Sequence, residues 1–249
     1  DPADRKLTAY ELMYCVFETQ TPACQTIDEL ATIVRKSRQS VAAACARAGV
    51  RLVAAGAHSF SDWRRYAYVD TEHYQWVKRE TGYISDRLLA FGLHIHVGMQ
   101  SAKTAAYVLH ECRNWVFPLL AMSANSPFFE GRDTGLASVR QHLFRAMPRT
   151  GLPPAVKSIA ELEQIYLHLL EAGDVLCPGD LWWMVRPQPP LGTIELRICD
   201  LPTDQHRLCV LTAVAQAALA QMQDRCLAGE PLTKFQDVYL EENHWKAMR

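Results

Sequence analysis

Two short segments carry residue types that can hold a cation and phosphate groups together. The first reads GLHIHVG, with His94 and His96 at alternate positions between apolar residues. Because successive side chains of a β-strand point to opposite faces, both imidazoles would lie on one face. Two such imidazoles can bind a metal, or one can bind a metal while the other contacts substrate. The alternative is a pair of half-exposed histidines that hydrogen-bond to their neighbours. The flanking Gly92 and Gly98 would let a ligand or another backbone approach closely.

The second segment reads GTIELRICD and follows the same alternation. Glu195 and Arg197 would share one face of a strand, opposite a face made of aliphatic residues. A carboxylate is a hard oxygen ligand for Mg²⁺, and a guanidinium group binds phosphate in a planar, bidentate manner. The alternative is a surface ion pair, which contributes only about 0–1 kcal/mol to stability.

Polar residues in three other segments could complete such a site. Glu18 lies among β-forming residues and could supply a third oxygen ligand. Arg186 stands before a proline, which favours an extended backbone and could aim the side chain at an anion. A turn-rich loop carries Asn125, Arg132 and Arg140 and leads into a short predicted helix, whose N-terminus would attract anions. The alternatives are an edge-strand carboxylate in solvent for Glu18, a solvent-exposed arginine in a tryptophan-rich packing segment for Arg186, and an ordinary surface loop for the third segment.

Capping and periodicity predict the elements that position these residues. Helices are predicted where a polar cap precedes an apolar periodicity and a glycine follows it, over 26–49, 158–173 and 204–227. A further helix is predicted over 102–116, ending near Pro118. Strands are predicted over 14–21, 51–57, 93–99 and 193–200. This alternation does not by itself decide between a parallel and an antiparallel sheet.

Composition indicates a globular protein of the cytoplasm. The 249 residues are 49% hydrophobic and 21% charged, which suits a sizeable core. A formal net charge of −1, without blocks of like charge, argues against nucleic acid or an anionic membrane as the main partner. The eight cysteines form no CxxC pair and are expected to be reduced. The polar start predicts no signal peptide. The longest apolar run, 210–222, is too short to span a bilayer, although the predicted helix around it could form a homo-oligomer interface.

Several common catalytic signatures are missing. The sequence has no P-loop pattern, no GxGxxG fingerprint, no HExxH and no GxSxG. If this chain uses ATP, it must therefore do so with another architecture.

Five ordered segments together resemble the bacterial carboxylate–amine ligases, relatives of glutamate–cysteine ligase with a glutamine synthetase-like fold. The segments are GLHIHVGM, MSANSPFFEGRDTGLASVRQHLF, MPRTGLPP, WWMVRPQPPLGTIELRICD and ENHWKAMR. The resemblance covers the chain from about Glu18 to Arg249. Five motifs in order are far more specific than any one of them.

The resemblance implies an α+β fold with a curved, mainly antiparallel sheet, helices packed on its outer face and an active site on the concave face. It also implies ATP-dependent amide formation. The γ-carboxylate of glutamate, or a similar carboxylate, would take the γ-phosphoryl group of ATP, and an amine such as cysteine would displace phosphate. Such a reaction depends on divalent cations and arginines that neutralise phosphate charge. ATP and Mg²⁺ (or Mn²⁺) are therefore expected.

The same resemblance implies roles for the residues above. Three are implied metal ligands: Glu18, His94 and Glu195. Three are implied catalytic groups that contact the substrate or the phosphoryl group: His96, Arg186 and Arg197. Three are implied substrate-binding or bracing residues: Asn125, Arg132 and Arg140.

One departure from the family's pattern concerns the two ends. Family members begin with a strand that carries a Glu-x-Glu pair, and no such strand precedes Glu18. By comparison with the family's pattern, we also expect a C-terminal portion beyond Arg249 to be absent from this sequence. We therefore expect a single catalytic domain over 1–249 that lacks these two parts. A site short of two carboxylates would bind Mg²⁺-ATP poorly, because Mg²⁺ needs hard oxygen ligands.

Two other functions stay open. One is a non-catalytic paralogue that binds a nucleotide or an amino acid. The other is a metal-dependent hydrolase in which His94 and His96 hold Zn²⁺ and activate water. Candidate further ligands for the hydrolase are His58, His110 and His206.

Overall fold

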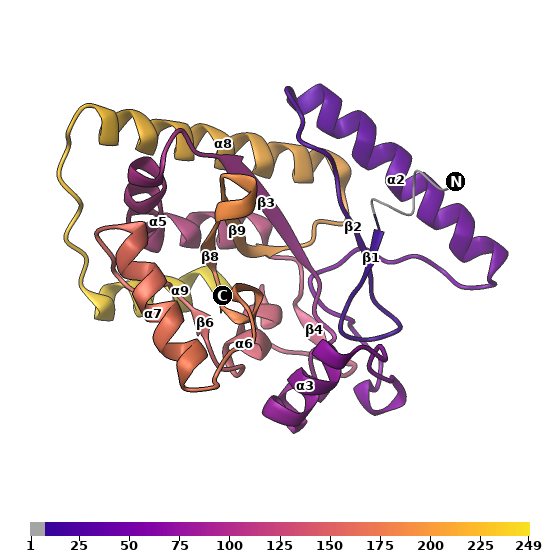
Figure 1. Cartoon of the computed structure of the whole chain (residues 1–249). Helices are drawn as coiled ribbons and strands as arrows, with labels where there is room; N and C mark the ends of the chain where they lie inside the picture. Colours follow the sequence, from indigo (N-terminus) through magenta and orange to yellow (C-terminus); the bar gives the residue numbers. More distant parts are fainter. Residues whose placement is uncertain (1–7) are drawn as a thin grey trace.

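The computed structural model describes residues 8–249 and has the expected α+β architecture. Its centre is a three-stranded antiparallel sheet made of β3 (Gly92–Gly98), β9 (Thr193–Asp200) and β8 (Val185–Gln188), with β9 in the middle (Figure 1). The two chemistry-bearing segments of the sequence are therefore neighbouring strands. Among the strand pairs of the described residues, only β6–β7 is parallel, so the expected antiparallel character of the sheet is confirmed.

Helices bury the apolar face of this sheet. α5 (Ala102–Ser123) packs against β9 and β8, and α7 (Ile159–Glu171), α8 (Gln205–Leu227) and α9 (Asp237–Met248) pack against α5. Three aliphatic residues at alternate positions of β9 are completely buried in this core: Ile194, Leu196 and Ile198. Burial of one such side chain contributes about 1.5–3 kcal/mol. The apolar face therefore fixes which side chains of β9 point to the opposite, polar face.

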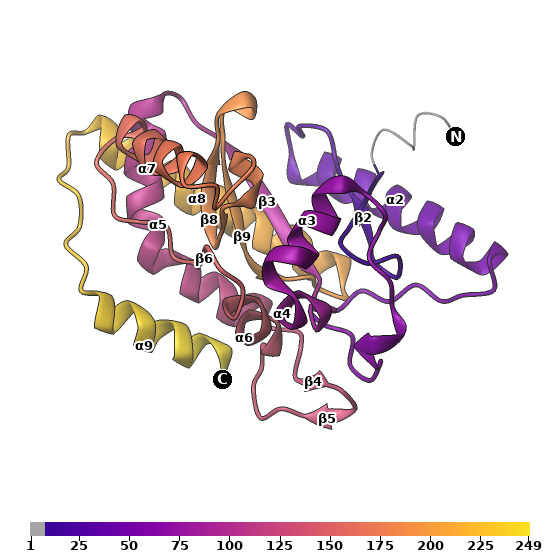
Figure 2. The same ribbon diagram turned by 60° about the horizontal axis from the view of Figure 1, so that its bottom comes forward.

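A second hydrophobic cluster lies beside the sheet and joins three parts of the chain. These parts are the hairpin β1 (Thr8–Tyr10) and β2 (Phe17–Thr19), the region that contains α3 (Glu72–Thr81) and α4 (Tyr83–Asp86), and α6 (Val139–Arg145) (Figure 2). The buried residues of this cluster include Met13, Trp76 and Leu89. The N-terminal hairpin and α3 are thereby held in a fixed position next to the polar face of the sheet.

The long helix α2 (Ile27–Arg47) projects from the body of the molecule next to α8 (Figure 1). The hydroxyl of Thr26 accepts a hydrogen bond from the backbone N–H of Glu29, as the predicted capping box requires. Arg38 donates to the carbonyl oxygens of Pro202 and Thr203 at 2.8 and 2.7 Å. These bonds tie α2 to the segment between β9 and α8.

Short elements connect these parts. In chain order they are η1 (Trp63–Arg65), β4 (Phe128–Phe129), β5 (Arg132–Asp133), β6 (Thr150–Gly151), η2 (Pro178–Asp180), β7 (Trp182–Trp183) and η3 (Pro189–Leu191). β6 runs parallel to β7, which directly precedes β8. This pairing brings the loop after α6 to the edge of the central sheet.

Two predicted elements differ from the structure. No strand forms over 51–57, where Arg51, Leu52 and Val53 are exposed and only Ala57 makes a single bridge. Without a partner strand, β-branched residues have no surface to pack on, and their strand preference has no effect. α5 does not end near Pro118 but continues to Ser123. A proline inside a helix costs about 3 kcal/mol, but the apolar residues on both sides of it are completely buried, and their burial outweighs this cost.

Replacing the buried His244 of α9 with phenylalanine should make stability less sensitive to acid. Burial, helped by the positive charge of Arg145, lowers the pKa of His244 to about 4 from an ordinary value of 6.5. The unfolded chain therefore takes up this proton first as the pH falls, and stability is lost between pH 6.5 and about 4. The loss should be about 2–3 kcal/mol after allowance for solvent screening.

In His244→Phe, which keeps the aromatic stacking on Phe117 at 5.7 Å between ring centroids, this part of the loss should vanish. Urea unfolding of both proteins across the same pH range measures it. An equal acid sensitivity in the two proteins would contradict the assignment.

Candidate functional site

The strand register aligns three polar residues across the sheet. His96 of β3 and Arg186 of β8 both lie opposite Glu195 of the central strand β9. Directly opposed side chains on one face of a sheet lie about 4.5–5.5 Å apart at Cβ, within reach of one another. A register shift between Leu93 and Ile95 lies at His94, which nevertheless shares the polar face. This alignment of polar residues on one face of the sheet confirms the predicted alternation of polar and apolar side chains in both segments.

The carboxylate of Glu195 is the centre of the polar face. It accepts hydrogen bonds from Arg186 Nε at 2.7 Å, from Gln188 Nε2 at 2.7 Å and from Arg197 Nη1. His94 Nδ1 lies 3.5 Å from the same carboxylate and His96 Nε2 3.9 Å from it. Glu195 is 2% exposed. Burial opposes its ionisation, but Arg197 and Arg186 outweigh burial, so its pKa lies well below the ordinary value and it is ionised at neutral pH.

Both histidines are held in the neutral form. Burial, followed by the positive charge of Arg197, lowers the pKa of His94 well below 6.5 despite the nearby Glu195. Burial also lowers the pKa of His96, whose Nδ1 is 3.0 Å from the hydroxyl of Thr193. A neutral imidazole has a free lone pair for a metal or for a substrate proton.

Arg186 is fixed by more than its ion pair. Its Nη1 donates to the carbonyl oxygens of Gly179 at 2.7 Å and Leu181 at 3.0 Å, in the loop that contains η2. The sequence predicted only an extended backbone at this position. The loop contacts, which hold the guanidinium group in place, come from the tertiary fold.

A carboxylate that the sequence interpretation missed, Glu11, joins the site beside Glu18. In the hairpin, Ala9 pairs with Glu18, and Glu11, two residues after Ala9, lies on the same face. Burial raises the pKa of Glu11, and the charge of Glu18 raises it further, whereas Leu12 N–H and Arg197 act in the opposite direction. Two carboxylates that share a site in this way favour a bound cation. The sequence feature that could have revealed Glu11 is a single glutamate within an apolar segment, just before the turn that leads to Glu18.

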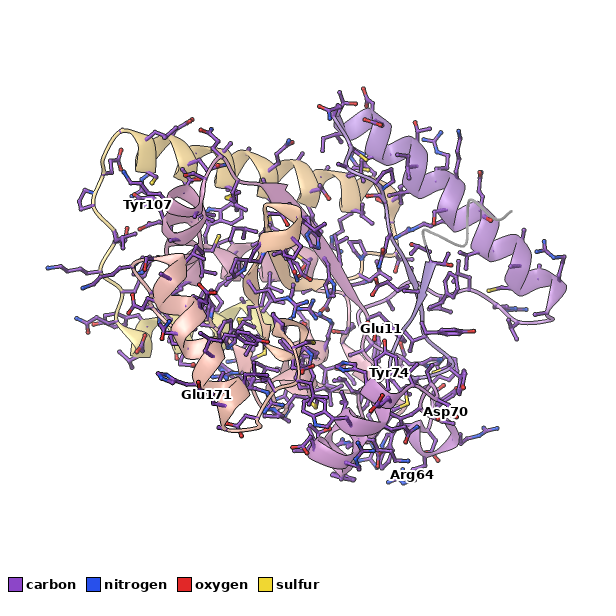
Figure 3. All side chains as sticks on the ribbon, in the orientation of Figure 1. Glu11, Arg64, Asp70, Tyr74, Tyr107 and Glu171 are labelled. Carbon is purple, nitrogen blue, oxygen red and sulfur yellow. The ribbon has the colours of Figure 1, made fainter. Side chains whose placement is uncertain are left out.

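Glu18 and α3 close the site on the side of the hairpin. The negative charge of Glu18 weakly opposes the lowering of the pKa of His96, so Glu18 lies on the same side of the sheet as that histidine. Its side chain accepts a hydrogen bond from Gln20 Nε2 at 2.8 Å and, within the described part of the chain, contacts neither histidine directly. Tyr74 of α3 donates to the carbonyl oxygen of Tyr10 at 2.9 Å. Burial raises the pKa of Tyr74 to about 12, and Glu11 and Glu18 add to this shift. Figure 3 shows Glu11 and Tyr74 next to one another between the hairpin and α3.

The carboxylate groups suit a hard divalent cation in type. Carboxylate oxygens are the ligands that Mg²⁺ and Mn²⁺ prefer, whereas imidazole nitrogens are more typical ligands of zinc, iron and nickel. Among residues 8–249, however, no three His, Cys, Asp or Glu side chains lie close enough together to hold a metal ion as they stand. A cation at Glu195 would have to displace Arg186 or Arg197. These groups therefore fit a cation that arrives with phosphate, because phosphate offers the released guanidinium a new partner.

Asn125 and Arg140 lie behind the site and brace β9. Arg140 is 3% exposed and donates to the backbone carbonyls of Ile198 and Arg197, both at 3.1 Å. A Cβ atom at Gly92 would collide with the guanidinium group of Arg140. The close approach predicted at Gly92 is therefore made by a side chain of the protein.

The completely buried carboxylate of Asp200 organises this bracing layer. It accepts hydrogen bonds from the backbone N–H of Asn125 at 2.9 Å and from the hydroxyl groups of Ser126 at 2.7 Å and Ser138 at 2.9 Å. Arg140 Nη1 lies 3.8 Å from it. The loop that precedes α6 is thereby fastened to the end of β9.

Arg132 is placed apart from these residues. It is exposed and lies in the β4–β5 hairpin, at the rim of the molecule (Figure 2). The three predicted substrate-binding residues thus divide into two that brace the site and one on an exposed hairpin.

Residues 2–249 match the sequence profile of glutamate–cysteine ligase family 2. The chain belongs to this family. The family was identified from five motifs, and two of them, GLHIHVGM and WWMVRPQPPLGTIELRICD, supply the three strands that carry the polar cluster.

Two curated relatives are named glutamate–cysteine ligase. The protein of Haloferax volcanii is 37% identical over 240 residues, covering 96% of this chain and 67% of the relative. That of Haloquadratum walsbyi is 35% identical over 240 residues, covering 96% of this chain and 66% of the relative. Against other relatives the share of their length falls to 61%. The chain therefore spans about two thirds of the length of the curated family members that it matches.

Within the described residues, no helix is long and apolar enough to cross a bilayer.

Removing the carboxylate of Asp200 should strongly destabilise the fold. Asp200→Ala leaves Arg140 buried without its ionic partner, and loss of one member of a buried pair costs about 3–5 kcal/mol. Asp200→Asn, which keeps one acceptor, should cost less. Urea unfolding monitored by tryptophan fluorescence measures the loss.

The matched control is Glu242→Ala, because Glu242 pairs with Lys246 on an exposed face of α9. This change should cost less than about 1 kcal/mol. If Asp200→Ala were as stable as the control, Asp200 would not organise the bracing layer.

Proposed function

We propose that this chain is the catalytic domain of an ATP-dependent carboxylate–amine ligase of the glutamate–cysteine ligase type. The carboxylate donor is glutamate or a similar acid, and the acceptor is an amine such as cysteine. The observation that supports this most directly is the buried Glu195 between Arg186 and Arg197, with two neutral imidazoles beside it. The names of the relatives point to the same reaction.

The proposed reaction proceeds in two steps. A carboxylate oxygen of the donor attacks the γ-phosphorus of ATP, and ADP leaves, which gives an acyl phosphate. The amine then attacks the acyl carbon, loses a proton and expels inorganic phosphate. Arg186 and Arg197 stabilise the negative charge on the transferring phosphoryl group, since planar guanidinium groups bind phosphate oxygens in a bidentate manner.

The metal ion of the proposed enzyme would be held by Glu195, His94 and Glu18, together with Glu11, once phosphate has drawn the arginines away from Glu195. When bound, Mg²⁺ or Mn²⁺ would neutralise part of the charge of the ATP phosphates. His96 contacts the substrate or the phosphoryl group. Asn125 and Arg140 act by holding β9 in place. Arg132 contacts the substrate from its exposed hairpin.

A glutamine synthetase-like arrangement of the sheet belongs to the same proposal. Its support is that the helices bury one face of the sheet and the charged side chains gather on the other. A single domain is supported by the interlocking of β9 with both halves of the chain: α5 packs on its apolar face, and the loop before α6 is fastened to its end.

One observation favours a second candidate, a paralogue that binds nucleotide or amino acid without turnover. Both guanidinium groups are engaged by Glu195, and an inactive site could keep this arrangement permanently. The hydrolase alternative has less support. His58 contacts Ser61, and His110 contacts the carbonyl of Thr233, so neither joins His94.

The test is release of ADP and phosphate by the purified protein with Mg²⁺-ATP. Both products should appear only when glutamate and an amine are present together. Glu195→Gln should lower kcat by about a hundredfold or more, because the carboxylate fixes both arginines and a metal ligand is lost. Coupled detection of ADP and phosphate provides the measurement.

The matched control is Glu163→Gln, which removes an exposed carboxylate of α7 and should leave kcat unchanged. Background ADP release with every amino acid and amine would contradict the ligase. Nucleotide binding by calorimetry in that same protein would then support the non-turnover paralogue.

A further inference from the structure

Arg149 stands in an unusual backbone conformation at the start of β6. Its φ is +55°, and apart from Glu130 it is the one non-glycine among the described residues with a positive φ. Such a conformation costs about 1–3 kcal/mol and persists only where the surroundings hold it. Arg149 belongs to the MPRTGLPP motif, which contributes no residue to the polar cluster around Glu195.

Two tryptophans lie within cation–π distance of this guanidinium group. The Cζ atom of Arg149 lies 5.9 Å from the ring centroid of Trp76 on α3 and 5.5 Å from that of Trp182 on β7. Its Nε donates to the backbone carbonyl of Asp180 at 3.4 Å. Arginine between aromatic faces keeps its charge and presents its N–H groups in one plane.

The guanidinium group has unused hydrogen-bonding capacity. Its Nη2 atom is buried and has no acceptor among the described residues. Two other arginines of the molecule contact a carboxylate: Arg140 faces Asp200, and Arg186 faces Glu195. No carboxylate of the described chain forms an ion pair with Arg149. Since a buried donor without a partner is costly, an acceptor from a ligand would complete this site.

A histidine and a buried carboxylate lie next to this guanidinium group. His73 of α3 stacks on Trp76, with ring centroids 5.9 Å apart, and its Nε2 lies 3.6 Å from the buried carboxylate of Asp180. That carboxylate also accepts the backbone N–H groups of Leu176 and Cys177. Both N–H groups go to Oδ2, whereas Oδ1 has no hydrogen-bond donor among the described residues. The carboxylate forms no ion pair with Arg149, so the Nη2 atom of Arg149 still lacks an acceptor.

This site is adjacent to the polar cluster. Arg186, which contacts Glu195, also donates to the carbonyls of Gly179 and Leu181. Arg149 donates to the carbonyl of Asp180, between them. These carbonyls lie within about 7 Å of one another along the chain. The two guanidinium groups therefore hold the same short loop, which places Arg149 close to the Glu195 cluster.

We propose that Arg149 binds the α-carboxylate of an amino-acid substrate whose reacting group lies at the Glu195 cluster. Trp76 and Trp182 pack against the guanidinium group, whose planar fork of N–H groups matches a carboxylate. This inference rests on the proposed ligase function. It makes Arg149 the residue that recognises an amino acid, and it leaves ATP recognition to the other arginines.

The test compares substrates with and without an α-carboxylate. The donor pair is glutamate and its α-amide, and the acceptor pair is cysteine and cysteamine. For one pair, wild-type protein should prefer the acid in kcat/KM, and Arg149→Gln should reduce kcat/KM for the acid about tenfold to a hundredfold. The partner without the carboxylate should be unaffected. The pair that responds identifies the substrate, donor or acceptor, that Arg149 holds.

Two further variants separate recognition from folding. Arg149→Lys keeps the positive charge but not the planar fork, and should recover only part of the preference. Arg64→Gln is the matched control, because Arg64 lies over Trp63 at 4.2 Å on an exposed surface, and it should keep the full preference. A preference retained in Arg149→Gln for both pairs, or an equal loss for acid and amide, would overturn the proposal.

Calorimetry separates failure of the Arg149 proposal from failure of the ligase proposal. If wild-type protein turns over no substrate pair, the ligase proposal is wrong. The Arg149 proposal is then tested by measuring the binding of glutamate and cysteine. Binding that weakens about tenfold or more in Arg149→Gln but not in Arg64→Gln supports the carboxylate site. Binding of neither amino acid to the wild type overturns it.

Discussion

The ionised carboxylate of Glu195 is the constraint on which the site depends. An isolated buried charge is prohibitively costly, and here two guanidinium groups and the amide of Gln188 compensate it. The same charges act on the neighbouring histidines, which burial and Arg197 keep neutral. One cluster thus contains an ionised acid, two fixed cations and two neutral bases at the same pH. Polar groups of this kind are the ones that charged phosphates and cations require.

Because arginines neutralise Glu195 in the free protein, a ligand must compete with this ion pairing in order to bind. The groups that would contact phosphate are also the groups that neutralise Glu195 in the free protein. A cation alone would compete with both arginines for one carboxylate, and phosphate alone would leave that carboxylate buried without a partner. A cation and phosphate that bind together resolve both problems at once, since each arginine exchanges one anion for another.

The cluster is precise because a second polar layer supports it. Arg140 binds the carbonyls of Arg197 and Ile198, and Asp200 fastens the loop around Ser126 to the end of β9. On the other flank, the loop with η2 holds Arg186, and Arg149 holds that same loop. The helices of the core keep β9 in place from its apolar face. The positions of the side chains in this site are therefore set by hydrogen bonds to the backbone on two flanks and by core packing on the apolar face.

The sequence by itself determined the local pattern of the site. Alternation placed His94 with His96 and Glu195 with Arg197, because a strand with one buried face allows only one assignment of its side chains. It did not determine that the two strands are neighbours, or that His96 lies opposite Glu195, because strand pairing is a long-range choice between many registers. Glu11 was missed since its approach to Glu18 arises from a hairpin register. Arg140 braces carbonyls of β9, and Arg149 packs against two tryptophans. In both cases the partners are far apart in the chain, and only tertiary packing brings them together.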